Sequence, residues 1–208
     1  MKILMLTWEY PPRVVGGIAR VVHDLSHRLI KDGHEVTVVT YKEGNVEDCE
    51  DDNGVKVYRV NNYMINPNNF IDWIMQLNFN LISKATELIS KEGPFDVIHA
   101  HDWLVAYAAK TLKDSFKIPI IATIHATEAG RNSGIHDEVQ RYINDTEWML
   151  TYESTGELFF ISVCNLFGNS NSEIIGNAML FSYLFQFSIY NQNCVVLYSF
   201  TKHNVVRL

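Results

Sequence analysis

The strongest constraint on the fold of this 208-residue chain is an alternation of short apolar runs with longer segments of helical periodicity. The first run, Ile3–Leu6, is apolar on both faces, as expected when helices cover both sides of a parallel sheet. The predicted strands are Ile3–Leu6, Glu35–Thr40, Val55–Val60, Val97–Ala100 and Pro119–Ile124. This pattern predicts an α/β fold, a Rossmann-like doubly wound parallel sheet with strand order 3-2-1-4-5 and the third strand at an edge.

A glycine pair separates the first strand from the first predicted helix. Pro11 and Pro12 exclude helix from the loop, and Gly16 and Gly17 then precede Ile18–Lys31, whose apolar residues recur at helical spacing. Helix N-termini attract anions, and glycine lets backbone N–H groups approach one. An ordinary turn that uses the conformational freedom of glycine remains an equal alternative. The loop matches neither a dinucleotide-binding GxGxxG sequence nor an ATP-binding P-loop.

Ionisable side chains mark the ends of the fourth and fifth predicted strands. His99, His101 and Asp102 end one strand, and His125 follows the other. The carboxyl ends of parallel strands share one edge, so these groups are expected to meet the glycine loop across a cleft. Asp102 is a candidate catalytic group or a helix cap, and His125 alone is also typical of a hydrogen-bonded structural histidine. We expect no metal here, because Asp102 points away from both histidines on an extended strand.

Composition narrows the classes of partner. The net charge of -7 argues against a general nucleic-acid binder and favours small or neutral partners. The acidic segment Glu43–Asn53 is expected to be a solvated loop rather than a cation site. Cys49, Cys164 and Cys194 indicate neither a disulfide framework nor a zinc site, which favours a cytoplasmic location. The apolar N-terminus is too short for a signal peptide or a membrane span.

Further helices and loops complete residues 1–154, which we interpret as one domain. The remaining predicted segments are an asparagine-rich loop at 61–69, helices at Phe70–Lys91, Leu104–Lys113 and His136–Tyr152, and a polar loop at His125–Arg131.

Residues 155–208 form an atypical tail in which only Glu157, Glu173, Lys202 and Arg207 carry charge. Leu158–Cys164 can serve as a sixth strand, and Ala178–Tyr190 is too short and too polar to favour a membrane anchor. The tail is expected to be poorly ordered, or to be translated out of frame.

Four sequence motifs, in this order, resemble the N-terminal half of retaining GT-B glycosyltransferases, most closely the glycogen and starch synthases. They are Glu9-Tyr10-Pro11-Pro12 with Gly16-Gly17-Ile18-Ala19, Asp32-Gly33-His34-Glu35-Val36, Asp96-Val97-Ile98-His99-Ala100-His101-Asp102-Trp103, and Thr123-Ile124-His125. The resemblance covers residues 1 to about 154. It implies a single N-terminal half of a GT-B fold, which holds mainly the carbohydrate acceptor, whereas a C-terminal domain holds most of the nucleotide-sugar donor.

The resemblance also implies roles for individual residues. Gly16 and Gly17 would approach the donor diphosphate, Asp102 would orient the reacting sugar or acceptor, and His125 would bind the donor sugar. The predicted acceptor-binding or substrate-binding residues are Glu9, Arg13 and His101. The donor would be a UDP-sugar or an ADP-sugar, with no separate cofactor. Charge stabilisation would supply most of the rate, with retention of configuration.

Two departures from the family pattern limit this prediction. Glycogen synthases carry a lysine before the glycine pair, whereas Val15 stands there and Arg13 is the nearest cation. Where the family continues with Trp-Arg-Val, this chain has Thr155-Gly156-Glu157-Leu158, whose codons can encode Trp-Arg-Val in a shifted frame. We therefore expect a truncated transferase that is inactive alone. The alternatives are a stand-alone half-enzyme, which binds a glycan or pairs with a separately encoded C-terminal domain, and a metal-dependent hydrolase built on His99, His101 and Asp102.

Overall fold

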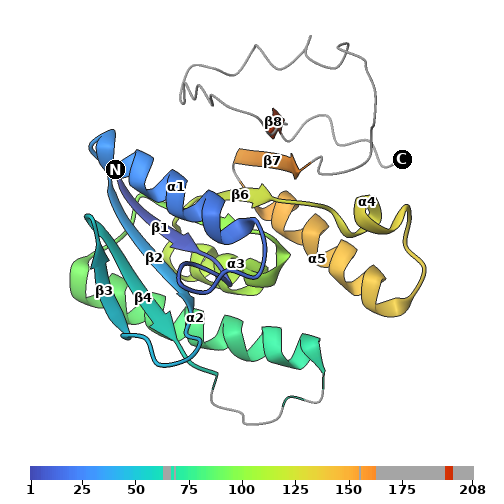
Figure 1. Cartoon of the computed structure of the whole chain (residues 1–208), viewed down its shortest axis with the longest axis horizontal. Helices are drawn as coiled ribbons and strands as arrows, with labels where there is room; N and C mark the ends of the chain where they lie inside the picture. Colours follow the sequence, from blue (N-terminus) through green and yellow to red (C-terminus); the bar gives the residue numbers. More distant parts are fainter. Residues whose placement is uncertain (63–66, 68, 155, 163–194, 199–208) are drawn as a thin grey trace.

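The computed structural model describes residues 1–62, 67, 69–154, 156–162 and 195–198. These residues form a central, mostly parallel sheet with helices on both faces (Figure 1). The predicted α/β class and its doubly wound arrangement are confirmed.

The first half of the chain builds a βαβ unit and a hairpin. Strand β1 (Lys2–Leu6) leads through the glycine loop into helix α1 (Ile18–Lys31), which returns the chain to β2 (Glu35–Tyr41). Strands β3 (Cys49–Asp52) and β4 (Val55–Val60) follow as an antiparallel pair.

Two predictions about this region are wrong. The acidic segment Glu43–Asn53 is not only a loop, because Cys49–Asp52 forms β3. Strand β4 (Val55–Val60) therefore pairs with a strand on each side, β2 and β3, and does not lie at the edge of the sheet. The turn explains the hairpin: Asn53 and Gly54 both have positive φ, and Gly54 donates its N–H to the Asp51 carboxylate.

The second half carries the longer helices. In chain order the elements are α2 (Phe70–Glu92), β5 (Val97–His101), the 3₁₀ turn η1 (Trp103–Val105), α3 (Ala106–Phe116), β6 (Ile120–Ile124), α4 (Glu128–Asn132), α5 (Glu138–Glu153), β7 (Gly156–Ser162) and β8 (Val195–Tyr198). The expected polar loop at His125–Arg131 is only partly correct, since α4 begins at Glu128. Thr127 caps this helix by accepting the N–H of Gly130.

The order of the strands follows the predicted topology. Across the described residues the order is β3-β4-β2-β1-β5-β6-β7-β8, whose central part, β4-β2-β1-β5-β6, matches the predicted 3-2-1-4-5 arrangement. β1 is parallel to both β2 and β5, so the chain reverses its winding direction at β1. In doubly wound sheets this switch point is where ligands bind.

Alternate side chains of β1 enter two separate cores. Ile3 and Met5 pack with α1 residues such as Val22, whereas Leu4 and Leu6 pack with α2 and α3. This period of two places α1 on one side of the sheet and α2 and α3 on the other (Figure 1).

Asn78 joins α2 to the chain that follows β5. Its amide nitrogen donates to the carbonyls of Ile74 and Leu104, and its oxygen accepts the N–H of Ala108, each at 2.8 Å. The buried amide is thus bonded on both sides, which fixes α2 against η1 and α3.

The tail is described only in β7 and β8. β7 pairs in parallel with β6, as expected of the sixth strand, and β8 pairs antiparallel with β7. Cys164, Cys194 and the apolar segment Ala178–Tyr190 lie outside the described residues. Within the described ranges, no helix combines the length and the hydropathy that a membrane span needs. The division at residue 154 and the reading frame of the tail stay predictions.

Candidate active site

Three strand ends meet beside the switch point. β5 lies between β1 and β6, with Leu6 opposite Ala100 and His101 opposite Thr123. The backbone N–H of Asp102 continues this ladder by donating to the carbonyl of Thr123 at 2.8 Å. The segments that begin with Thr7, Asp102 and His125 therefore all leave the sheet at the carboxyl ends of adjacent parallel strands, as the sequence predicted.

Glu9 organises the glycine loop from inside. Its fully buried carboxylate accepts the backbone N–H groups of Val15 at 2.6 Å, Gly16 at 3.0 Å and Ala19 at 3.1 Å. Glu9 thereby caps the start of α1, where Gly17 offers no side chain. The Gly16 N–H is directed at a carboxylate of the chain itself, while a Cβ at Gly17 would meet open space.

Asp102 combines burial with a strained backbone. Its φ of 69° and ψ of 169° fall in a region that is almost reserved for glycine, at a cost of about 1–3 kcal/mol. One carboxylate oxygen, Oδ1, accepts the N–H of Trp103 at 2.9 Å and so caps η1, which confirms the capping alternative. The other, Oδ2, has no hydrogen-bond donor within the described part of the chain.

The protonation of Asp102 depends on this environment. Burial raises its pKa to about 6, although the N–H of Trp103 and the charge of Arg131 oppose the shift. Arg131 Nη2 lies 3.6 Å from Asp102 Oδ2, and Arg131 Nη1 lies 3.8 Å from Glu128 Oε2. Glu147 accepts the N–H of Glu128 with both oxygens, and burial raises the pKa of Glu147 to about 7.

The buried histidines lie in a row across β5 and β6. His99 Nε2 is 2.7 Å from the hydroxyl of Thr123, and His101 Nδ1 is 3.2 Å from His125 Nε2. Burial lowers the pKa of His99 to about 3, that of His125 to about 4, and that of His101 well below its usual value. All three rings are therefore neutral at neutral pH. They bind one another and Thr123 rather than gathering around Asp102 as metal ligands.

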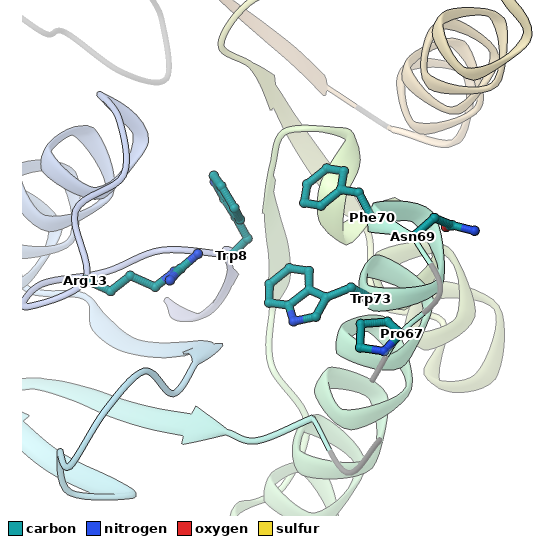
Figure 2. A pocket seen from close by; sticks show the side chains of 6 residues that line it. All are labelled: Trp8, Arg13, Pro67, Asn69, Phe70 and Trp73. Atoms are coloured by element: carbon teal, nitrogen blue, oxygen red, sulfur yellow. The ribbon is translucent and has the colours of Figure 1, made fainter. Parts of the chain in front are cut away.

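An aromatic pocket lies between the loop after β1 and the start of α2. It has a volume of about 320 Å³ and is lined by Trp8, Arg13, Pro67, Asn69, Phe70 and Trp73. Figure 2 shows Trp8 and Arg13 on one side, facing the rings of Phe70 and Trp73 on the other. The half-exposed Phe70 ring also makes an edge contact, 6.2 Å between centroids, with Trp103. Trp103 donates its backbone N–H to Asp102, so the ring contact between Phe70 and Trp103 connects the pocket lining to the strand end.

Arg13 is held by its neighbours. It forms an ion pair with Glu43 and lies over the rings of Trp8 and Tyr41, with its guanidinium carbon 5.1 Å and 5.2 Å from their centroids. Arg13 is thus the nearest cation on the loop and is positioned at the pocket rather than at the glycine pair.

The structure brings most of the predicted residues to the same end of the sheet, but they do not all contact one another. The N–H of Gly16 is bonded to Glu9. Asp102 and His101 are fully buried, and His125 is almost fully buried. The predicted roles of these residues in substrate binding stay predictions. The sequence interpretation missed Arg131, Glu128 and Glu147 as site residues. They belong to α4 and α5, which fold back to Asp102, and no local motif marks that return.

Known proteins match most of the length of this chain. The family model described as the starch synthase catalytic domain matches residues 2–162. The chain belongs to the starch synthase catalytic domain family. Its relatives include a glycogen synthase of Mycobacterium tuberculosis, 35% identical over 168 residues, which cover 74% of this chain and 41% of the relative. An uncharacterised glycosyltransferase of Methanocaldococcus jannaschii is 36% identical over 185 residues, covering 84% and 45%.

Solved structures place this starch synthase-like domain within the GT-B fold. Sucrose-phosphate synthase from Thermosynechococcus elongatus matches with a TM-score of 0.58 and 18% identity, over 73% of this chain and 39% of that protein. Arabidopsis thaliana UGT89C1, complexed with UDP-L-rhamnose, matches with a TM-score of 0.52 and 16% identity, over 76% and 41%. The chain thus spans less than half the length of these proteins.

Proposed function

We propose that this chain forms the acceptor-side half of a retaining glycosyltransferase that moves a sugar from a UDP-sugar or ADP-sugar to a glycan. The observation that carries the proposal is Asp102, a strained, fully buried carboxylate with one oxygen that lacks a hydrogen-bond donor among the described residues. Strain and an unbonded buried oxygen are costly, and they are typical of sites where a ligand supplies the missing contact.

In this proposal Asp102 accepts a hydroxyl of the reacting sugar or of the acceptor. A neutral His125 hydrogen-bonds the donor sugar without adding a charge beside the departing diphosphate. His101 positions His125 through the contact between their rings. Gly17 and the N-terminus of α1 approach the diphosphate, while Glu9 holds the loop in shape.

The aromatic pocket is the proposed acceptor subsite. Trp8 and Phe70 offer the apolar faces on which sugar rings stack. Trp8 Nε1 and Arg13 Nε are buried N–H donors that have no acceptor in the described ranges, and hydroxyl oxygens of a glycan suit both. Trp103 links this pocket to Asp102 and would place the acceptor beside the reaction centre.

We also propose that the 208 residues alone do not complete the transfer. The cations beside the strand ends, Arg13 and Arg131, already face carboxylates, so the described half offers little positive charge to a leaving diphosphate. Radiolabelled transfer from UDP-glucose or ADP-glucose to glycogen should stay at the background rate with the purified chain. Transfer at a normal enzymatic rate would contradict this proposal.

The catalytic role of Asp102 can be tested in a completed enzyme. We would join residues 1–162 to the C-terminal region of the Methanocaldococcus jannaschii relative and measure transfer. We expect activity to appear and Asp102→Asn to lower kcat by about 100-fold or more. The matched control is Asp96→Asn at the opposite end of β5, whose carboxylate accepts the N–H of Lys2. Equal loss in both variants would point to misfolding and reject a catalytic role.

A second candidate function is glycan binding without catalysis, either alone or with a separately encoded C-terminal domain. The pocket favours it, because described residues of this chain supply both aromatic faces and an arginine to its lining. Retention on immobilised glycogen that falls about tenfold in Trp8→Ala, but not in Trp148→Ala on α5, would support the subsite. Co-purification of a partner that carries the missing domain would favour the half-enzyme, whereas a disrupted reading frame after codon 154 would favour truncation.

A further inference from the structure

A second cluster of ionisable groups lies away from the strand ends, between α1 and the β3–β4 turn. It consists of His23 and His27, one helical turn apart on α1, and Asp52 at the end of β3. One ligand atom from each of the three residues lies within 4.8 Å of the others. All three side chains are partly exposed.

The hydrogen bonds of the two histidines fix which ring nitrogen carries the proton. His27 Nδ1 lies 2.8 Å from the backbone carbonyl of His23, and His23 Nδ1 lies 3.1 Å from the carboxylate of Asp24. Both partners only accept hydrogen bonds, so each Nδ1 is the protonated nitrogen. Each Nε2 of a neutral ring is then left with a lone pair. Such contacts are how proteins orient histidine ligands of metals.

The two Nε2 atoms face an acceptor rather than a donor. His23 Nε2 lies 3.6 Å from Asp52 Oδ2, and His27 Nε2 lies 3.5 Å from Asp52 Oδ1. His27 Nε2 is buried and has no hydrogen-bond partner among the described residues. Lone pairs that face a carboxylate repel it unless a positive charge lies between them. The arrangement is therefore stabilised by a positive charge between these atoms, which a bound metal ion can supply.

The spacing suits a small metal ion. A tetrahedral zinc ion with bonds of about 2.1 Å holds neighbouring ligand atoms about 3.4 Å apart. The distances from His23 Nε2 and His27 Nε2 to the nearer oxygen of Asp52, 3.6 Å and 3.5 Å, are close to this value. The carboxylate is itself held in place, because Tyr10 donates its hydroxyl to Asp52 Oδ2 at 2.9 Å and Asn53 donates to Oδ1 at 3.0 Å. Two imidazoles and a carboxylate select zinc and its transition-metal neighbours over magnesium or calcium.

We propose that His23, His27 and Asp52 form a binding site for one divalent transition-metal ion, with zinc as the preferred ion. Three protein ligands leave a coordination position for water. The ion joins α1 to the β3–β4 turn and, through Tyr10, to the start of the glycine loop, so its proposed role is to stiffen the base of that loop. This site does not depend on the proposed transferase activity.

The experiment uses the untagged 208-residue chain, stripped with EDTA and dialysed against micromolar zinc chloride. We expect about one equivalent of zinc by atomic emission and a rise in the unfolding temperature. His23→Gln and His27→Gln should each weaken binding at least tenfold, whereas His136→Gln, at an exposed histidine before α5, should not. Binding below about a tenth of an equivalent, or unchanged binding in both α1 variants, would overturn the proposal.

A measurement on the unaltered chain covers the case in which a variant fails to fold. Cobalt chloride should give the intense visible absorption of a low-coordinate Co²⁺ site, and zinc should abolish it. Zinc should also shift the Nε2 resonances of two histidines in long-range ¹⁵N spectra. If these nitrogens instead protonate and take no metal, His27 and Asp52 form a simple ion pair and no metal site exists.

Discussion

Two fully buried carboxylates stand at neighbouring strand ends, and their surroundings differ in one respect. Glu9 accepts three backbone N–H groups, which the glycine loop and α1 supply. Asp102 accepts one N–H, and its second oxygen has only the more distant Arg131. A buried charge is tolerated when its hydrogen bonds are made. Glu9 thus holds the loop and the start of α1 in place, while Asp102 keeps one oxygen for a ligand and has a raised pKa.

The largest expected effect on stability comes from removing the carboxylate of Glu9. Glu9→Ala should lower the free energy of unfolding by about 2–4 kcal/mol, because the N–H of Ala19 loses its acceptor inside the protein and α1 loses its cap. Urea unfolding followed by circular dichroism measures the change. Glu9→Gln keeps one acceptor oxygen and should lose about half as much. A loss below about 0.5 kcal/mol in Glu9→Ala would show that the loop finds other acceptors.

The second prediction uses pH to expose the raised pKa of Asp102. A raised carboxyl pKa stabilises the fold below the unfolded value near 3.8, and this stability is lost as pH rises through about 6. Asp102→Asn does not ionise, so the variant does not lose this stability as pH rises. The stability of the variant relative to the unaltered chain should therefore rise by about 1–3 kcal/mol between pH 4 and pH 8. Urea midpoints across this range test the prediction, and a difference that stays flat with pH would contradict it.

The smallest expected change in stability comes from replacing Arg131, which lies beside Asp102. Arg131 lowers the pKa of Asp102 and of His125 through its charge, so Arg131→Gln should raise both. The Arg131 side chain is 45% exposed, and solvent screening keeps the change in stability within about 0.5 kcal/mol. Carboxyl ¹³C and ring ¹⁵N titrations measure the two values. Arg141→Gln, at an exposed position on α5, is the control and should move neither.

Patterns that repeat along the chain predicted most of the fold. Helix α1 and strand β4 have the bounds that the sequence indicated, because amphipathic spacing and alternation are local signals. The acidic β3 was missed because Cys49–Asp52 lacks apolar residues and gains its ladder from β4. The contacts of Asp52 with Tyr10, His23 and His27 arise only in the folded chain.

The candidate site was predicted only where strand topology determines position. The convergence of the glycine loop, Asp102 and His125 follows from the parallel order of the strands. The engagement of Glu9 with the loop, and the approach of Arg131 and Glu147 to Asp102, depend on how loops and short helices fold back. Such long-range contacts have no periodic signature in a single sequence.

The Asn78 amide has a mechanical consequence. By bonding Ile74 and Leu104 at once, it ties the first turns of α2 to the turn that follows Asp102. A displacement of the start of α2 would therefore be passed on to Leu104, two residues after Asp102, so Phe70 and Trp73 of the pocket are coupled to the candidate acid. Trp8, from the loop after β1, packs edge-on against both of these rings.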